Sequence, residues 1–433
     1  MNLDRTIAPQ VKDFDRLSIP SCRHLILDNG IKLNIVDHGE FDVNRLSISW
    51  IGGAFDVDSF ASLMLACDLM REGTKFHSGA EIAETLDYNG AWLKSNHHTH
   101  HTALTLHSLN SKFSEVLPIL VESITSPSFP QQEFEINREK IARRKEINLS
   151  KVAYLSNQSN QRLIYGVDHP CAQDESPLDV RNISIDNIRA IHRDIFVADG
   201  CELFLAGRIT PAIEDALNKW IGSIPTNQRH LAQRVIPLSP SSQKLDIVNV
   251  DDALQCAITM SIPTIPRSHP DYIDLRYVIM ALGGYFGSRL MNNIREDKGY
   301  TYGISAALLG NWEGGVATIA TQCDNAYAKA VIEEVKNEIE LLKLNNFDKD
   351  ELTRLKRYAM TQIAGTLDSP FSIMDYYENQ RHVHTPDGYF QAMQLSLNNL
   401  DSQRIASLAT KYINIDELRI SISGDKTKIN ITE

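Results

Sequence analysis

Residues 126–139 read SPSFPQQEFEINRE, and residues 343–356 read KLNNFDKDELTRLK. Each stretch places a phenylalanine shortly before a helix-forming run, and these residues, Phe129 and Phe347, are 218 positions apart. The glutamates four positions further on keep the same separation. Because chance similarity does not hold one register over several positions, the two stretches indicate that the chain repeats one unit of roughly 220 residues.

A nearly equal offset of 217 positions recurs further along the chain, where CELFLAG ends at Gly207 and LRISISG ends at Gly424. A proline- and serine-rich linker at 222–243 separates a first unit, 1–221, from a second unit, 244–433. Each unit mixes strand-like alternation with amphipathic helical runs. The sequence therefore predicts an α+β fold of two homologous domains, each with an antiparallel-rich sheet covered by helices.

The composition excludes several functional classes. The net charge of −12 leaves nothing to neutralise phosphates, which argues against a nucleic-acid binder or a partner of anionic membranes. No apolar run approaches the ~18 residues of a membrane span. The six cysteines are scattered without paired spacing, and no signal peptide is visible at the N-terminus. These features predict a cytoplasmic protein with free thiols.

A second informative stretch, residues 283–303, reads GGYFGSRLMNNIREDKGYTYG. It predicts a helix that ends near Arg295, a Lys-Gly break, and a strand that opens near Tyr302. This layout can direct a guanidinium and a phenol toward one point. Taken alone, the stretch favours a capped helix, a turn and a strand that have only a structural role.

Taken together, the two units, the Gly73-Thr74 pair after the first helix and the SRL…REDKGYTY run resemble the insulinase/pitrilysin-type zinc peptidases, the inverted HxxEH family. The resemblance is to the small bacterial form, in which two chains of about this length pair as a clam-shell. It implies that Arg295 and Tyr302 are the family's Arg-x6-Tyr pair, which grips the peptide substrate at the scissile bond.

The family binds zinc through two histidines that flank a glutamate on one helix, with a distant glutamate as third ligand. The window that precedes Gly73-Thr74 contains no histidine. Glu139 and Glu146 match the family's downstream glutamates, although a solvated helix face is the simpler interpretation of this pair. The resemblance therefore implies a degenerate metal site at Leu65, Cys67, Asp68, Leu69 and Glu146.

Histidines 97, 98, 100 and 101 form a separate cluster. If residues 94–102 form one strand, His98 and His100 share one face while His97 and His101 share the other. Alignment to the family makes this strand an edge that an extended peptide joins by strand addition. The favoured interpretation is a polar chamber wall; an adventitious or a dedicated metal site is the alternative. The expected substrate-binding residues are Arg295, Tyr302, Ser95, Asn96, His97 and His98.

The resemblance implies a non-catalytic subunit of a heterodimeric zinc metalloendopeptidase, inactive alone and without a cofactor of its own. A partner chain would carry HxxEH and the zinc, while this chain would close the chamber around a peptide. One alternative is a peptide-binding or scaffold protein of the same fold. Another is a metalloprotein that uses the strand from His97 to His101.

Overall fold

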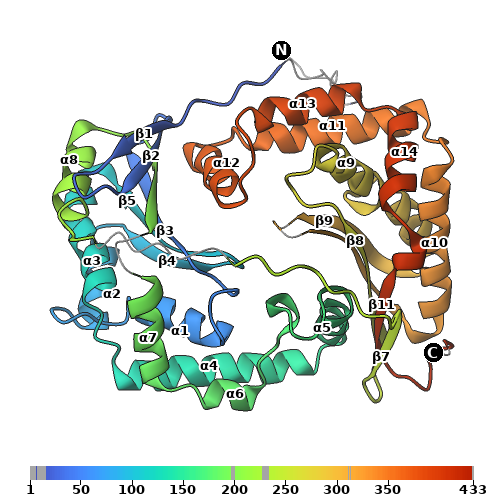
Figure 1. Cartoon of the computed structure of the whole chain (residues 1–433), viewed down its shortest axis with the longest axis horizontal. Coiled ribbons are helices and arrows are strands. Elements are labelled where there is room, and N and C mark those ends of the chain that lie inside the picture. The colour runs from blue at the N-terminus through green and yellow to red at the C-terminus, as the bar shows by residue number, and fades with distance from the viewer. Residues whose placement is uncertain are drawn as a thin grey trace.

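The computed structural model describes most of the chain, namely residues 6, 16–196, 200–226, 234–310, 312 and 314–431. Here the first half means the described residues up to 226, and the second half means those from 234 onward. Figure 1 shows the two halves side by side, with most helices along the outer rim and the sheets nearer the centre.

A six-stranded sheet lies at the heart of the first half. Its order is β1-β2-β6-β3-β5-β4, in which β2 and β6 run parallel and the other neighbours run antiparallel. The strands are β1 (Arg23–Ile26), β2 (Lys32–Asp37), β3 (Val43–Ile51), β4 (Trp92–His97), β5 (His101–Leu109) and β6 (Cys201–Gly207). The α-helices are α1 (Phe60–Leu69), α2 (Gly79–Tyr88), α3 (Phe113–Thr125), α4 (Gln131–Leu149), α5 (Val152–Tyr165), α6 (Pro177–Arg181), α7 (Ile185–Ile195) and α8 (Pro211–Trp220).

The second half repeats this arrangement with one strand fewer. Its sheet has the order β7-β11-β8-β10-β9, in which β7 and β11 run parallel, as β2 and β6 do in the first sheet. The strands are β7 (Leu245–Asn249), β8 (Gln255–Thr264), β9 (Thr301–Gly310), β10 (Gly315–Asp324) and β11 (Arg419–Gly424). The helices are α9 (Tyr272–Gly283), the π-helix η3 (Met291–Asp297), α10 (Ala328–Lys343), α11 (Lys349–Gly365), α12 (Pro370–His382), α13 (Tyr389–Asn399) and α14 (Ser402–Tyr412). The predicted α+β fold of two homologous units is confirmed.

Local sequence signals account for several of these elements. Ser78 and Glu81 form the predicted reciprocal capping box at the start of α2, and Asp348 caps α11 through the backbone N–H of Glu351. The Asn29-Gly30 turn joins β1 to β2 as a hairpin. Apolar residues of each sheet and its outer helices then form a separate core in each half.

One helix from each half is exchanged. The first-half helix α5 packs on β8 and β11 of the second half, and α12 of the second half packs on β2 and β6 of the first. Their first residues, Val152 and Pro370, differ by the repeat offset of 218. Figure 1 shows both helices on the inner side of the molecule. The exchange therefore fixes the two halves to each other symmetrically.

Each exchanged helix makes its own set of contacts with the other half. On α5, Asn160 Nδ2 donates to the carbonyls of Thr259 at 3.1 Å and Arg419 at 3.0 Å, and its side chain is buried. On α12, Ile373 and Met374 pack against an apolar patch of the first sheet made by Val36, Phe204 and Ala206. Asn160 is the polar anchor because it satisfies backbone carbonyls of both β8 and β11.

The Asn160→Ala substitution tests this anchor. We expect a loss of about 1–3 kcal/mol of unfolding free energy, because two buried carbonyls lose their donor. Chemical denaturation followed by circular dichroism measures the change. The matched control is Asn157→Ala on the exposed side of the same helix, which should stay within about 0.5 kcal/mol of the parent. Equal effects of the two substitutions would contradict the assignment.

Candidate functional site

The helix that would carry the zinc motif is filled with core side chains. Leu65, Cys67 and Leu69 on α1 are buried in the core of the first half. Burial also raises the pKa of the Cys67 thiol well above its ordinary value, which keeps it from acting as a thiolate ligand. Asp68 accepts a hydrogen bond from Ser95 Oγ at 2.5 Å, so its carboxylate is committed to β4.

The downstream glutamates are also engaged. Arg181, the last residue of α6, donates through Nε to Glu139 at 2.9 Å and through Nη1 to Glu146 at 2.7 Å. These bonds and one from Arg143 lower the pKa of Glu139 to about 2. A guanidinium thus lies against the carboxylate that would be the third zinc ligand. It would repel a cation bound there.

The residues present do not fit a zinc ion. The α1 window offers no imidazole, its one carboxylate is bonded to Ser95, and Glu146 is paired with Arg181. Within the described part of the chain, His, Cys, Asp and Glu side chains nowhere gather in threes in a way that would hold a metal. No catalytic step through a metal on this chain is therefore derived.

The predicted single strand over residues 94–102 is wrong. The chain turns at residues 98–100, so that β4 and β5 form a hairpin and His97 and His101 lie on different strands. The loop after β3 holds this turn, because the N–H groups of Ala54 and Phe55 donate to the carbonyls of His98 and Thr99 at 3.0 and 3.1 Å. The tip has none of the glycine or asparagine signals of a tight turn, so local sequence did not reveal it.

A neighbouring glycine makes this contact possible. A Cβ on Gly53 would lie 2.4 Å from the His98 carbonyl oxygen and 2.5 Å from that of Thr99. No larger residue fits there without moving the backbone. The shape of the histidine hairpin is thus set by a loop almost fifty residues earlier in the chain.

The four predicted peptide-contacting residues on the hairpin separate onto two sides. Ser95 faces α1 through Asp68, and His97 lies near Phe60 of α1, with ring centroids 6.4 Å apart. Asn96 and His98 line a pocket on the other side of the sheet. The structure therefore does not bring the four side chains to one surface.

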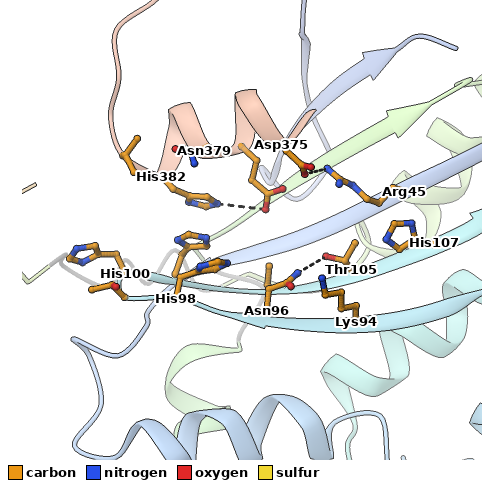
Figure 2. A pocket seen from close by; sticks show the side chains of 15 residues that line it. Arg45, Lys94, Asn96, His98, His100, Thr105, His107, Asp375, Asn379 and His382 are labelled. Carbon is orange, nitrogen blue, oxygen red and sulfur yellow. Dashed lines mark hydrogen bonds and ion pairs between the residues drawn. The ribbon is translucent and has the colours of Figure 1, made fainter. Parts of the chain in front are cut away.

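This pocket, of about 460 Å³, lies between the first sheet and the exchanged helix α12. Figure 2 shows Asp375 and His382 of α12 on one side and Lys94, Asn96 and His107 of the strands on the other. Arg45 Nη2 pairs with Asp375 Oδ1 at 2.6 Å across it. The side chains from α12 were missed by the sequence analysis. Their only sequence signal is that α12 occupies the repeat position of α5.

The histidines of the pocket are stacked rather than convergent. The His101 ring lies 3.6 Å from the His382 ring at an interplanar angle of 8°, and 4.3 Å from the His98 ring at 20°. Imidazole lone pairs lie in the ring plane, so parallel rings cannot direct them to one ion. Burial lowers the pKa of His101 to about 2 and, with less effect, that of His98. This geometry disfavours the alternative of a metal site on the hairpin.

Arg295 and Tyr302 lie on η3 and β9, which contact each other. Arg295 Nη1 pairs with Glu296 at 2.6 Å, and its guanidinium lies 4.7 Å above the Phe286 ring. Tyr302 is 92% exposed on β9, the edge strand of the second sheet. Both side chains are therefore accessible to a ligand.

The surroundings hold η3 in place. Arg289, just before the π-helix, forms a bidentate pair with Glu351 of α11, at 2.7 and 3.1 Å. Asn293 donates to Glu338 of α10 at 2.6 Å, and Lys298 pairs with Glu334 of the same helix. The sequence analysis did not single out these contacts, which fix the backbone that carries Arg295.

Comparisons with known proteins agree with this architecture. Residues 66–163 match the family described as insulinase (peptidase family M16), and residues 182–358 match the peptidase M16 inactive domain. The chain belongs to the insulinase (M16) family. It is an inactive-type member, because the helix that would bind zinc lacks the motif.

Individual relatives are distant but extend over most of the chain. A Bacillus subtilis protein named "uncharacterized zinc protease YmxG" is 21% identical over 80% of this chain and 84% of its own length. A Helicobacter pylori protein named "non-peptidase homolog YmxG" is 20% identical over 87% of each chain. A crystal structure of a peptidase M16 inactive domain from Pseudomonas fluorescens has a TM-score of 0.86 at 18% identity, covering 95% of this chain and 100% of its own. At such identities the structural likeness shows the fold alone.

The search for membrane-spanning segments gave a negative result. Among the residues that the structure describes, none of the helices combines the length and apolar character needed to cross a membrane.

The exposure of Tyr302 leads to a stability prediction. The Tyr302→Ala variant should lose less than about 0.5 kcal/mol of unfolding free energy, because the side chain buries almost nothing. Tyr277→Ala is the matched comparison and should lose about 3 kcal/mol or more, since that ring is buried and its hydroxyl donates to the Met393 carbonyl. Thermal and urea unfolding measure both. A large loss from Tyr302→Ala would assign that residue a structural role.

Proposed function

We propose that this chain is the non-catalytic subunit of a heterodimeric zinc metalloendopeptidase. In this proposal a second chain supplies the HxxEH helix and the zinc. The present chain closes the proteolytic chamber as one half of a clam-shell and presents Arg295 and Tyr302 to the peptide. The observation that carries the proposal is the contrast between the two halves. In the first half, core side chains occupy the positions of the zinc ligands on α1. In the second half, Arg295 is partly exposed and Tyr302 is almost fully exposed.

The pair has chemistry that suits a peptide. A guanidinium donates charged hydrogen bonds to carbonyl oxygens, and a phenol adds one more donor. Donors that face a scissile carbonyl stabilise the negative charge that develops on its oxygen. The Arg295–Glu296 pair is partly exposed and therefore weak, so a substrate carbonyl can replace Glu296 at little cost.

The Arg295→Ala variant tests this role in the mixed complex. We expect a drop of about 100-fold or more in the turnover of an internally quenched peptide, which is the usual effect of losing an oxyanion donor. Assembly with the catalytic chain, followed by size-exclusion chromatography, should be unchanged. Arg193→Ala on α7 is the control, because it removes an equally charged but remote surface arginine. Unchanged turnover by Arg295→Ala would contradict the proposed role.

A second prediction concerns the isolated chain. Purified without a partner, it should contain far less than one zinc per chain by elemental analysis and should not cleave peptides. The reason is that α1 has no imidazole and Arg181 lies beside Glu146. Chelator-sensitive cleavage by the isolated chain would disprove this assignment.

A scaffold role in the same fold is the second candidate. It is favoured by the Helicobacter pylori relative, which is named as a non-peptidase homolog. A complex that forms with an HxxEH chain but whose activity does not depend on Arg295 would favour it. The metalloprotein alternative on the His97–His101 hairpin lacks support, because those rings stack instead of converging.

A further inference from the structure

A stack of three imidazoles crosses the boundary between the halves. The histidine cluster is defined here as His98 and His101 from the β4–β5 hairpin together with His382 from α12. His101 is the middle ring, 4.3 Å from His98 and 3.6 Å from His382. Figure 2 shows His98 on the strand side of the pocket and His382 on the α12 side. Two rings of the first half thus hold one ring of the second.

A second ring contact lies next to the cluster. Trp312, just after β9, stacks on His100 of the hairpin tip with ring centroids 4.2 Å apart. Its indole N–H donates to the His382 carbonyl oxygen at 3.1 Å. The hairpin tip of the first half and the loop after β9 therefore meet at the C-terminal end of α12.

Hydrogen bonds from β3 complete the contact. His382 Nε2 lies 3.0 Å from Ser49 Oγ, and Ser47 Oγ donates to Glu378 Oε1 at 3.0 Å. Both serines are buried on β3. One end of α12 is therefore held by aromatic stacking and by polar bonds, in addition to the apolar contacts of Ile373 and Met374.

The stack accommodates neutral rings better than charged ones. A proton on the half-buried His101 would place a positive charge within 4.3 Å of two other imidazoles. Burial and these neighbours lower the pKa of His101 to about 2, and burial together with His169 and His384 lowers that of His100 to about 4.

The surrounding charged side chains offset little of the cost of protonating the stacked rings. Arg45 pairs with Asp375 at 2.6 Å, and Arg381 pairs with Glu202 at 3.2 Å. Glu378 is left as the carboxylate nearest the stack, 3.7 Å from His382 Nε2, and balances at most one added charge. The titratable and charged groups facing the cluster are Arg45, Lys94, His97, His100, His107, His169, Glu202, Asp375, Glu378, Arg381 and His384.

We propose that the histidine cluster is a pH-sensitive latch that holds α12 on the first sheet at neutral pH and releases it in acid. Neutral rings stack and keep the two halves together. Protonated rings repel one another, and α12 leaves the sheet with the second half attached. The latch does not depend on the proposed peptidase role, because it works equally in a scaffold.

The direction of the pH effect follows from proton linkage. A released histidine titrates near the ordinary value of about 6.5, whereas burial in the docked state lowers the pKa of His98, His100 and His101. The free energy by which the latch stabilises the docked state is therefore fully present above about pH 6.5. It is lost as the pH falls toward the pKa values of the docked histidines. For a histidine with a strongly lowered pKa, docking weakens about 25-fold between pH 7 and pH 5.

Small-angle X-ray scattering of the full chain between pH 7.5 and 4.5 tests the latch, with circular dichroism recorded on the same samples. The radius of gyration of the parent chain should increase as the pH falls below about 6, with the helical signal retained. The His101→Phe/His382→Phe variant keeps the stacked rings but removes the closest pair of protonation sites and leaves His98 as the one titratable ring of the cluster, so it should stay compact. The control is His38→Phe, an exposed site that should behave like the parent.

A second variant keeps the test decisive if the double variant misfolds. Glu378→Gln retains the oxygen that accepts from Ser47 but removes the balancing charge, so the expansion should shift to higher pH. The proposal is overturned if the parent radius does not change with pH, or if the helical signal is lost together with compactness. It is also overturned if the folded double variant expands as the parent does, or if Glu378→Gln leaves the midpoint unchanged.

Discussion

The exchange of α5 and α12 is the constraint on which the structure depends. Each sheet needs a helix to cover part of its inner face, and in both halves that helix comes from the other half. Neither sheet could bury its apolar surface and satisfy its backbone in the same way alone. Asn160 shows this directly, because its amide bonds to carbonyls that belong to the other half. The repeated unit of sequence therefore differs from the packed unit of structure, in which each sheet is covered by a helix from the other half.

The side chains at the zinc-ligand positions of α1 are part of the ordinary core packing of the first half. With leucines at the positions of the inward-facing ligands, α1 is apolar and buried on most of its faces, and Leu65 and Leu69 are part of the first core. The carboxylates of Glu139 and Glu146 on α4 pair with Arg181 of α6. An arginine joins α4 to α6 where a zinc ion would join α4 to α1.

The sequence predicted what depends on repetition and on local signals. The register from Phe129 to Phe347 was enough to predict two equivalent α+β units, and the capping box at Ser78 marked the start of α2. It did not predict the hairpin at His98, because the bonds that hold the tip come from the backbone beside Gly53. Nor did the sequence predict that α12 packs on the first sheet. The apolar periodicity of a helix is the same whether it packs on the sheet of its own half or on that of the other half.

In the second half, strand β9 connects the arginine–tyrosine region to the contact with the histidine hairpin. Tyr302 lies at the start of β9, and Trp312, which contacts the histidine hairpin, follows the end of the same strand. An extended segment of ten residues spans roughly 33 Å, so the two aromatic residues lie far apart on one element. Because β9 is hydrogen-bonded along most of its length to β10, it moves as part of the sheet and not as a loop. A displacement of the second half at the histidine cluster therefore displaces the edge that carries Tyr302. In the proposed peptidase, the position of the arginine–tyrosine pair depends on how α12 is seated.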